Sequence, residues 1–235
     1  MLIIIKEKNN VHIALTAWGT ADCICEADML LEENLPLWRV ENAPKCLMAT
    51  TGVSSLGYDL LRYGDFHLRT ALTPINLVTK IIPAMKEKLE AFDQLDKDGD
   101  NWGGIVIAKG NKVYHLACDF CYEEIEESLA IGRDSDVARG ALRMTRGLPA
   151  LERIKEVCRI METTYKYKEF PVVVMSTATQ GRTVLYDRDV TAQAAFFDEP
   201  VPEEDLSFVD PEQALRTYPA EQPSAEELLG QRAGS

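Results

Sequence analysis

Apolar and polar residues alternate in short blocks along this chain, and the first fifteen residues already have the pattern of a β-hairpin. The apolar run Leu2–Ile5 leads into a charged edge, the chain turns at Asn9-Asn10, and a second apolar run follows over Val11–Leu15. Asparagine favours tight turns because it tolerates left-handed backbone angles. We therefore predict a hairpin that begins at residue 2, which is unusual because chain ends normally fray.

The next segment predicts a second hairpin and a helix. Apolar runs at Leu35–Trp38 and Lys45–Ala49 form the hairpin, and Ser54 or Ser55 is a good N-cap for a helix that continues to Tyr63. Polar N-cap side chains accept hydrogen bonds from the first free N–H groups of a helix, so the boundary is predicted on a physical basis.

A second helix is predicted after Thr73, because Pro74 then occupies the first helical position, where its missing N–H is not needed. Apolar residues recur at the spacing of one buried helix face, at Leu77, Val78, Ile81, Ile82, Met85 and Leu89. Pro83 falls inside this run and cannot donate a backbone hydrogen bond, so we expect a kink or a later start.

The second half of the chain repeats the order of strands followed by helices. Strands are predicted over 105–108, 113–117 and 129–131, helices over 136–146 and 149–165, and a last hairpin over 172–175 and 183–186. Strands and helices are grouped here and do not alternate one by one. The pattern therefore indicates an α+β fold in which helices cover antiparallel sheets.

Composition places the chain among globular proteins with a sizeable core. It has 235 residues, of which 46% are hydrophobic and 27% charged. No apolar run approaches the roughly 18 residues of a membrane-spanning helix, and no signal-peptide pattern precedes the first strand. Because the six cysteines come without such a leader, we expect reduced thiols and a cytoplasmic location.

The net charge of −13 is concentrated at the C-terminal end. From Asp198 to Ser235 ten acidic residues face only two arginines, and five of the eleven prolines lie in this stretch. Such a composition cannot bury enough apolar surface to order itself. We therefore divide the chain into a folded domain, residues 1–196, and an acidic, Pro-rich, disordered tail, residues 197–235. The acidic body also argues against nucleic acid or an anionic membrane as a partner.

Three local motifs, and the order in which they follow one another along the chain, resemble the proteasome-like family of N-terminal nucleophile hydrolases. The segment Leu129–Leu142 reads LAIGRDSDVARGAL, similar to the family's Ala-Ile-Gly-Ser-Gly turn and the small-residue helix after it. Upstream, Gly104–Tyr114 is similar to the family's central hairpin, and Ala49–Gly52 to its strand-end glycine. The resemblance extends from residue 1 to about residue 190. It implies a four-layer αββα sandwich of two antiparallel sheets flanked by helices, and assembly into rings.

The resemblance also implies a catalytic site, which we compared position by position. In the family a terminal Thr, Ser or Cys attacks the peptide carbonyl and its own amine is the base. That position falls on Met1 or Leu2 here, and neither side chain is a nucleophile. The orienting carboxylate falls on Thr16 and the lysine that lowers the amine pKa falls on Leu37 or its neighbours.

Two further positions complete the implied site. The family's supporting serine falls on Arg133, whereas Gly52 matches the glycine whose amide forms the oxyanion hole. A glycine at position 52 also has a purely conformational explanation. Four of the five positions thus depart from the catalytic pattern, and we expect no amide hydrolysis.

An acidic loop has part of a calcium-binding pattern. Asp96, Asp98 and Asp100 stand at the first, third and fifth positions of an EF-hand loop. The sixth position is Asn101 instead of glycine, and the twelfth is Ile107, inside a predicted strand, instead of glutamate. A solvated acidic turn is therefore predicted, with the three aspartates as weak cation candidates.

Four cysteines have spacings that occur in zinc sites. Cys118 and Cys121 form a CxxC pair, and Cys23 and Cys25 offer two more thiols. No glycine-rich knuckle accompanies either pair, so packing as small hydrophobic residues is the favoured interpretation. We accordingly predict no bound metal and no cofactor.

Three functional hypotheses follow. The first is a catalytically inactive proteasome-like subunit, a structural or interaction protein in a homo-oligomer, in which a ring is possible and the acidic tail docks to another protein. The second is an active threonine peptidase or amidase with a rearranged site. The third is a binding module that uses the former active-site cleft. We favour the first, because four catalytic positions depart from the pattern. The homo-oligomer is expected because two helices carry more apolar residues than one buried stripe needs, and the alternative is that all five are core: Met144, Leu148, Val157, Ile160 and Met161.

The tail assignment predicts a proteolysis pattern. Brief digestion of the full chain is expected to cut first between about residues 198 and 235 and to leave a stable core of roughly 190 residues, because extended segments enter protease active sites. Mass spectrometry of the fragments checks this. Early cuts in the body with an intact tail would show that the tail is docked and that our assignment is wrong.

Overall fold

The N-terminal hairpin is confirmed, and its first strand is buried on both faces. Strands β1 (Leu2–Lys6) and β2 (Val11–Thr16) pair antiparallel, with Leu2 opposite Leu15. The four residues Leu2–Ile5 are all buried. A strand with no solvent-facing side must lie inside a sheet that is covered on both faces. The opening run of four apolar residues therefore already requires a layered architecture.

The computed structural model describes residues 1–16, 35–53, 55–100, 103–132, 134–165, 172–185 and 193–195, all within one unit, Met1–Val201. The predicted tail, residues 197–235, lies outside the described residues. The remaining strands are β3 (Leu37–Arg39), β4 (Cys46–Thr51), β5 (Gly104–Lys109), β6 (Lys112–Leu116), β7 (Tyr122–Glu124), β8 (Ser128–Ile131), β9 (Val172–Ser176), β10 (Arg182–Leu185) and β11 (Gln193–Ala195).

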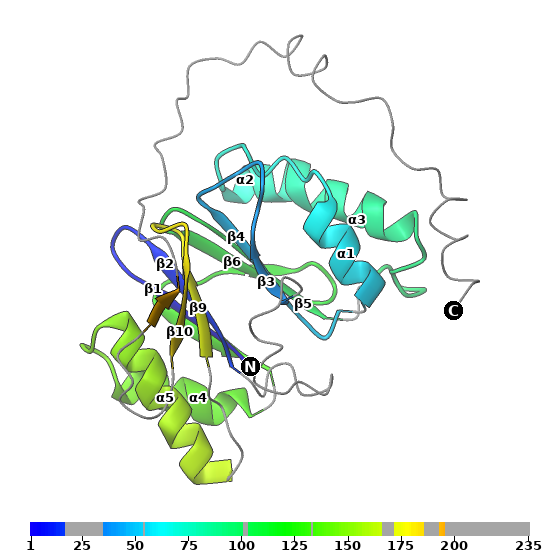
Figure 1. The fold of residues 1–235 in the computed structure, drawn as a ribbon. Helices are drawn as coiled ribbons and strands as arrows, with labels where there is room; N and C mark the ends of the chain where they lie inside the picture. Colours follow the sequence, from blue (N-terminus) through cyan, green and yellow to red (C-terminus); the bar gives the residue numbers. More distant parts are fainter. Residues whose placement is uncertain are drawn as a thin grey trace, which may run out of the picture. The chain divides into compact units, whose positions relative to one another are not determined.

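The described strands form two antiparallel sheets. One has the order β11-β10-β9-β2-β1-β8 and the other the order β3-β4-β5-β6-β7. Helices α1 (Ser55–Tyr63), α2 (Pro74–Asn76) and α3 (Ile82–Glu90) lie over the second sheet, and α4 (Ser135–Met144) and α5 (Ala150–Tyr165) lie over the first (Figure 1). The fold is therefore a four-layer α+β sandwich in the order helix, sheet, sheet, helix, as predicted.

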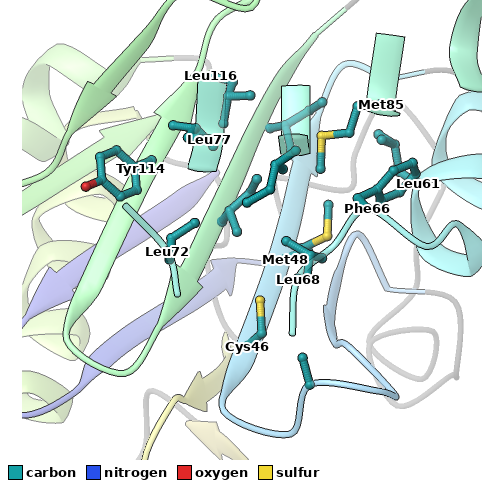
Figure 2. Close-up of a cluster of buried hydrophobic side chains, with 14 of the residues drawn as sticks. Cys46, Met48, Leu61, Phe66, Leu68, Leu72, Leu77, Met85, Tyr114 and Leu116 are labelled. Atoms are coloured by element: carbon teal, nitrogen blue, oxygen red, sulfur yellow. The ribbon is translucent and has the colours of Figure 1, made fainter. Parts of the chain in front are cut away.

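Three apolar clusters fill the spaces between these layers. One lies between the two sheets, and its members come from both: Leu2, Ile4, Ile13, Leu15, Leu37, Leu47, Val106, Val113 and Val173 are among them. The second lies beneath α4 and α5, where Met1, Ile3 and Ile5 meet Ile154, Val157 and Met161. The third lies beneath α1 and α3 and is drawn in Figure 2, where Met48, Leu61, Phe66, Leu77 and Met85 gather around the outer face of β4 and β5.

The predicted irregularity near Pro83 takes the form of a π-helical turn. Between α2 and α3 the segment Leu77–Ile81 is π-helical, and the N–H of Ile82 donates to the carbonyl of Leu77, five residues earlier. Thr73 caps the start, because its hydroxyl accepts the N–H of Asn76 at 3.2 Å. A π turn widens the helix and accommodates a proline that cannot donate to the preceding turn.

Two short strands were not predicted from the sequence. β7 contains Glu123 and Glu124 and lies at the edge of its sheet, so it has little of the apolar alternation by which strands are recognised. β11 is a three-residue edge strand of the other sheet. Edge strands need only one partner and few apolar residues, so their patterns are weak.

Polar contacts tie the two sheets together near the turn of the first hairpin. The hydroxyl of Thr177, which follows β9, accepts the N–H of Val11 at 2.9 Å and donates to the carbonyl of Gly110, between β5 and β6, at 2.6 Å. Arg39 on β3 donates to the carbonyl of Ser176 at 2.7 Å and also to those of Pro44 and Thr179. One threonine and one arginine thus bridge strands and loops of both sheets.

Glu124 joins charges from both sheets around a buried tyrosine. Its carboxylate accepts the hydroxyl proton of Tyr114 at 3.0 Å, is hydrogen-bonded by Lys112, and lies 3.6 Å from the ammonium of Lys6. Burial, aided by this carboxylate, raises the pKa of Tyr114 to about 12, so the hydroxyl stays protonated. The hydrogen bond from Lys112 is the main cause of the lowered pKa of Glu124.

This arrangement predicts a pH-dependent stability term. Because the pKa of Glu124 is lower in the folded state, its contribution is complete above the ordinary glutamate pKa of about 4.3 and is lost as the pH falls through the lowered value. We expect Glu124→Gln to reduce the loss of unfolding free energy between about pH 6 and pH 3, as measured by urea denaturation. Glu126→Gln, at an exposed neighbour, is the matched control. Equal acid sensitivity of the wild type and the Glu124 variant would contradict this assignment.

Candidate functional site

At the head of β1, the end where the strand begins, Met1 is hydrogen-bonded to Thr16, the last residue of the neighbouring strand β2. The terminal amine of Met1 donates to the hydroxyl oxygen of Thr16 at 3.1 Å, and the N–H of Thr16 donates to the carbonyl of Met1 at 3.0 Å. These bonds continue the pairing of Leu2 with Leu15 by one more residue pair. Met1 is therefore ordered by the same ladder as the strand that follows it.

Gly132 closes the other side of this strand end. It follows β8, which pairs with β1, and a Cβ at this position would lie only 3.4 Å from the Cα of Met1. Its φ of +117° also disfavours any residue with a side chain. The carbonyl of Gly132 accepts the N–H of Ser135 at 3.3 Å, at the start of α4. The turn between β8 and α4 is thus packed directly on the first residue.

Alternation along β1 separates the two residues that could occupy the nucleophile position. Met1 belongs to the cluster beneath α4 and α5, whereas Leu2 points between the sheets. Leu37 belongs to the same inter-sheet cluster as Leu2. The structure thus places Leu2 and Leu37, the residues at the implied nucleophile and lysine positions, in one apolar core.

The three other positions of the implied site, Thr16, Gly52 and Arg133, are described here in turn. Thr16 is completely buried, opposite Val172 of β9, and contacts Met1. Gly52 follows β4 in the other sheet with a φ of +71°. Arg133 lies outside the described residues. The structure thus brings together Leu2 with Leu37, and Met1 with Thr16.

Gly52 is shaped by close backbone packing. A Cβ on Gly103 would lie 1.8 Å from the carbonyl oxygen of Thr51 and 2.7 Å from the carbonyl carbon of Gly52. The turn after β4 therefore has no space for a side chain at position 103. At position 52 the left-handed backbone favours glycine. The presence of Gly52 has this conformational explanation beside the catalytic one.

The weak cation candidates form a turn that uses its own carboxylate. Asp96 accepts the N–H of Asp98 at 2.8 Å and the N–H of Asp100 at 3.0 Å through the same oxygen. Across the described part of the chain, no group of three histidine, cysteine, aspartate or glutamate side chains is arranged to hold a metal ion. Of the four zinc-spaced cysteines, Cys118 and Cys121 are exposed and unbridged, and Cys23 and Cys25 lie outside the described residues.

The chemistry available at the head of β1 follows from these contacts. Leu2 and Leu37 offer no group that attacks a carbonyl or holds a proton. The amine of Met1 and the hydroxyl of Thr16 are close enough to share a proton. Thr16 has no exposed surface, so a substrate reaches this pair only if the structure opens.

Sequence reasoning missed two features of this site. It treated Met1 and Leu2 as equivalent, although strict alternation of side chains along a strand already assigns them to opposite faces. It also read Thr16 only as a lost carboxylate, and not as the hydrogen-bond acceptor of the terminal amine. The register of the hairpin, fixed by the turn at Asn9-Asn10, was the signal that paired residue 1 with residue 16.

None of the described helices combines the length and the apolar character needed to cross a membrane.

Comparison with known proteins gives a match at the level of the fold. No protein-family model matches the chain, and no curated protein matches its sequence. Among solved structures, BPH from Thiobacillus denitrificans in complex with Epoxomicin superposes with a TM-score of 0.56 at 17% identity, over 74% of this chain and 96% of that one. A second structure of BPH gives a TM-score of 0.54 at 18% identity, with the same coverage. HslV from Trypanosoma brucei gives 0.49 at 12% identity, over 74% of this chain and 97% of that one. The chain therefore shares the four-layer fold of these proteasome-like structures.

Proposed function

We propose that this chain is a catalytically inactive proteasome-like subunit that acts as a structural or interaction protein in a homo-oligomer. The observation that carries the proposal is that Leu2 and Leu37, which the resemblance assigns to the positions of the nucleophile and the lysine, pack together in the inter-sheet core. An ammonium group in place of Leu37 would be buried in that core without an assured counter-charge, at a cost of several kcal/mol. The core therefore favours the leucines that are present and disfavours the catalytic pair.

The hydroxyl of Thr16 supports the same conclusion. In an N-terminal nucleophile site the carboxylate at this position interacts with charged groups, whereas here a neutral hydroxyl accepts one hydrogen bond from the amine of Met1. Met1 itself is packed beneath α4 and α5, so its side chain serves as core. Both ends of this contact thus have a structural role.

Exposed apolar residues support self-association. Of the five residues singled out on α4, on α5 and between them, Val157 and Met161 are core and Ile160 is half-buried. Met144, at the end of α4, and Leu148, between the two helices, are exposed by 82% and 45%. On the opposite helix layer Tyr63 and Ile75 are also largely exposed. Both outer helix layers therefore offer apolar contacts to a neighbouring copy, which is consistent with a closed ring.

The proposed function is placed in a reducing compartment such as the cytoplasm, in which exposed thiols stay reduced. Cys46, Cys118, Cys121 and Cys158 are all unbridged, including the two that are exposed.

One observation favours a second function, an amidase with a rearranged site. The amine of Met1 lies 3.1 Å from the hydroxyl of Thr16, so an amine in its neutral form could accept the proton of a threonine on the neighbouring strand. Complete burial of Thr16 counts against this function. The two functions differ in a measurable way, because only the second needs Thr16 for turnover.

The favoured function predicts no peptidase activity. The full chain, with its N-terminal mass verified as starting at Met1, should not hydrolyse a panel of fluorogenic peptides above a buffer blank or become covalently labelled by epoxomicin. Intact-mass spectrometry and fluorescence measure both. Turnover that disappears in Thr16→Val and persists in Thr16→Ser would establish the rearranged site instead. Turnover by a chain that has lost ten or more N-terminal residues would show that the site is created by processing.

Self-association predicts a solution mass above that of one chain. Light scattering at micromolar concentration should give a multiple of 26.3 kDa. The double variant Met144→Glu/Leu148→Glu should shift the mass towards the monomer, because two charges would have to lose water at the contact. Thr163→Glu, at an exposed site on α5, adds a charge outside this patch and is the matched control. A wild-type mass near 26.3 kDa would contradict the homo-oligomer.

A further inference from the structure

Two exposed cysteines lie in the turn between β6 and β7, which the proposed function does not use. Cys118 and Cys121 are both exposed and neither belongs to a disulfide. Cys46 and Cys158, by contrast, are buried in the clusters beneath the helices. The CxxC pair is therefore accessible to small thiol reagents, and the buried pair is protected by packing.

The chain reverses its direction between the two cysteines. The N–H of Phe120 donates to the carbonyl of Ala117 at 3.0 Å, and the N–H of Ala117 donates to the carbonyl of Cys121 at 2.8 Å. The four residues of this turn are Ala117–Phe120, so Cys118 lies inside it and Cys121 follows it directly. The bond between Ala117 and Cys121 places Cys121 opposite the residue that precedes Cys118, so a disulfide, which joins Cα atoms about 4.4–6.8 Å apart, needs only a local adjustment of the turn.

Phe120 fixes the conformation of this turn. Its φ is +62°, unusual for a residue with a side chain, and its ring is buried in the cluster beneath α3. The ammonium of Lys86 on α3 lies 4.8 Å from the centre of that ring. Packing of Phe120 thus holds the loop in shape while the thiols are reduced. Bridging the thiols then needs little further ordering of the chain.

Asp119 makes the two thiols unequal. Its carboxylate accepts the N–H of Cys121 at 2.8 Å, and its hydrogen bond with the thiol is the main cause of the raised pKa of Cys121. Cys121 is therefore held as a neutral thiol near neutral pH. Because the thiolate is the reactive form, the raised pKa makes Cys121 a poor first nucleophile, and we assign the first attack to Cys118.

We propose that Cys118 and Cys121 form a reversible dithiol–disulfide site that exchanges with small peptide disulfides of the glutathione class. The thiolate of Cys118 attacks one sulfur of the small disulfide, which forms a mixed disulfide and releases one half of the reagent as a thiol. Cys121 then attacks the sulfur of Cys118 and releases the other half. Two cysteine thiols are oxidised, one small disulfide is reduced to two thiols, and the two cysteine protons end on the released thiols.

The surroundings favour thiol exchange over metal binding at this pair. Across the residues that the structure describes, no third histidine, cysteine, aspartate or glutamate converges with the two thiols in an arrangement that could hold a metal. Structural zinc needs four ligands, and two thiolates alone bind it weakly. Exchange chemistry needs only the pair itself.

The test uses the full chain in glutathione buffers of graded oxidation. A background variant, Cys23→Ser/Cys25→Ser, removes the other closely spaced pair. After acid quenching and alkylation, mass spectrometry should show a Cys118–Cys121 disulfide that forms with increasing oxidation and disappears on reduction. Cys46 and Cys158 should stay reduced throughout, because they are buried. A pair that stays reduced in the most oxidising buffer would overturn the proposal.

Single variants test the order of the two steps. In Cys121→Ser the mixed disulfide on Cys118 should accumulate, because no second thiol resolves it. In Cys118→Ser the remaining Cys121 should react more slowly than Cys118 does in Cys121→Ser. Adding Asp119→Asn to Cys118→Ser should make Cys121 react faster. Persistent mixed disulfide on Cys118 in the presence of Cys121, or a disulfide between Cys118 and another chain, would contradict an intramolecular site.

Discussion

The whole fold depends on the exclusion of water from the face that the two sheets share. Leu2 and Ile4 of β1 point into this face, and Leu37, Leu47 and Val106 meet them from the other sheet. Apolar burial is non-directional, so it brings the sheets together without fixing their relative position. The hydrogen bonds of Thr177 and Arg39 supply that position, because each bonds to strands or loops on both sides. Helices then need to cover only the two outer faces.

This dependence explains which parts of the fold could be predicted from the sequence. The core strands carry apolar runs that are long enough to recognise, so the hairpins and the helix pairs followed from the pattern, whereas the order of the four layers followed from the family resemblance. The edge strands β7 and β11 carry short or charged sequences, and each pairs only with the strand just before it, so little apolar alternation marks them in the sequence. The π turn was predicted only as a kink, because Pro83 shows where a regular helix fails and not how the chain resolves it.

The candidate site was predictable as a set of positions but not as a set of contacts. The resemblance identified Leu2, Thr16, Leu37 and Gly52 as the residues to compare with a catalytic pattern. It did not show that Leu2 and Leu37 share one cluster, which depends on the stacking of two sheets. The contact between Met1 and Thr16 follows from hairpin register, which a local pattern fixes. Leu2 and Leu37, the residues at two of the compared positions, thus belong to the same apolar interface that holds the sheets together.

The π turn also affects how this chain can be aligned with others. Leu77, Ile81, Met85 and Leu89 recur every fourth residue, and in a regular α-helix each such step rotates past a full turn by about 40°. The wider turn at Leu77–Ile81 absorbs part of this rotation and keeps the apolar residues over the sheet. A π turn is equivalent to an α-helix with one inserted residue, and here Val78 and Thr79 are exposed to solvent. A related chain with one residue fewer here can keep the same buried contacts. Its residues after the turn would then be offset by one from ours in sequence number, and superposition of the two structures would identify the equivalent positions.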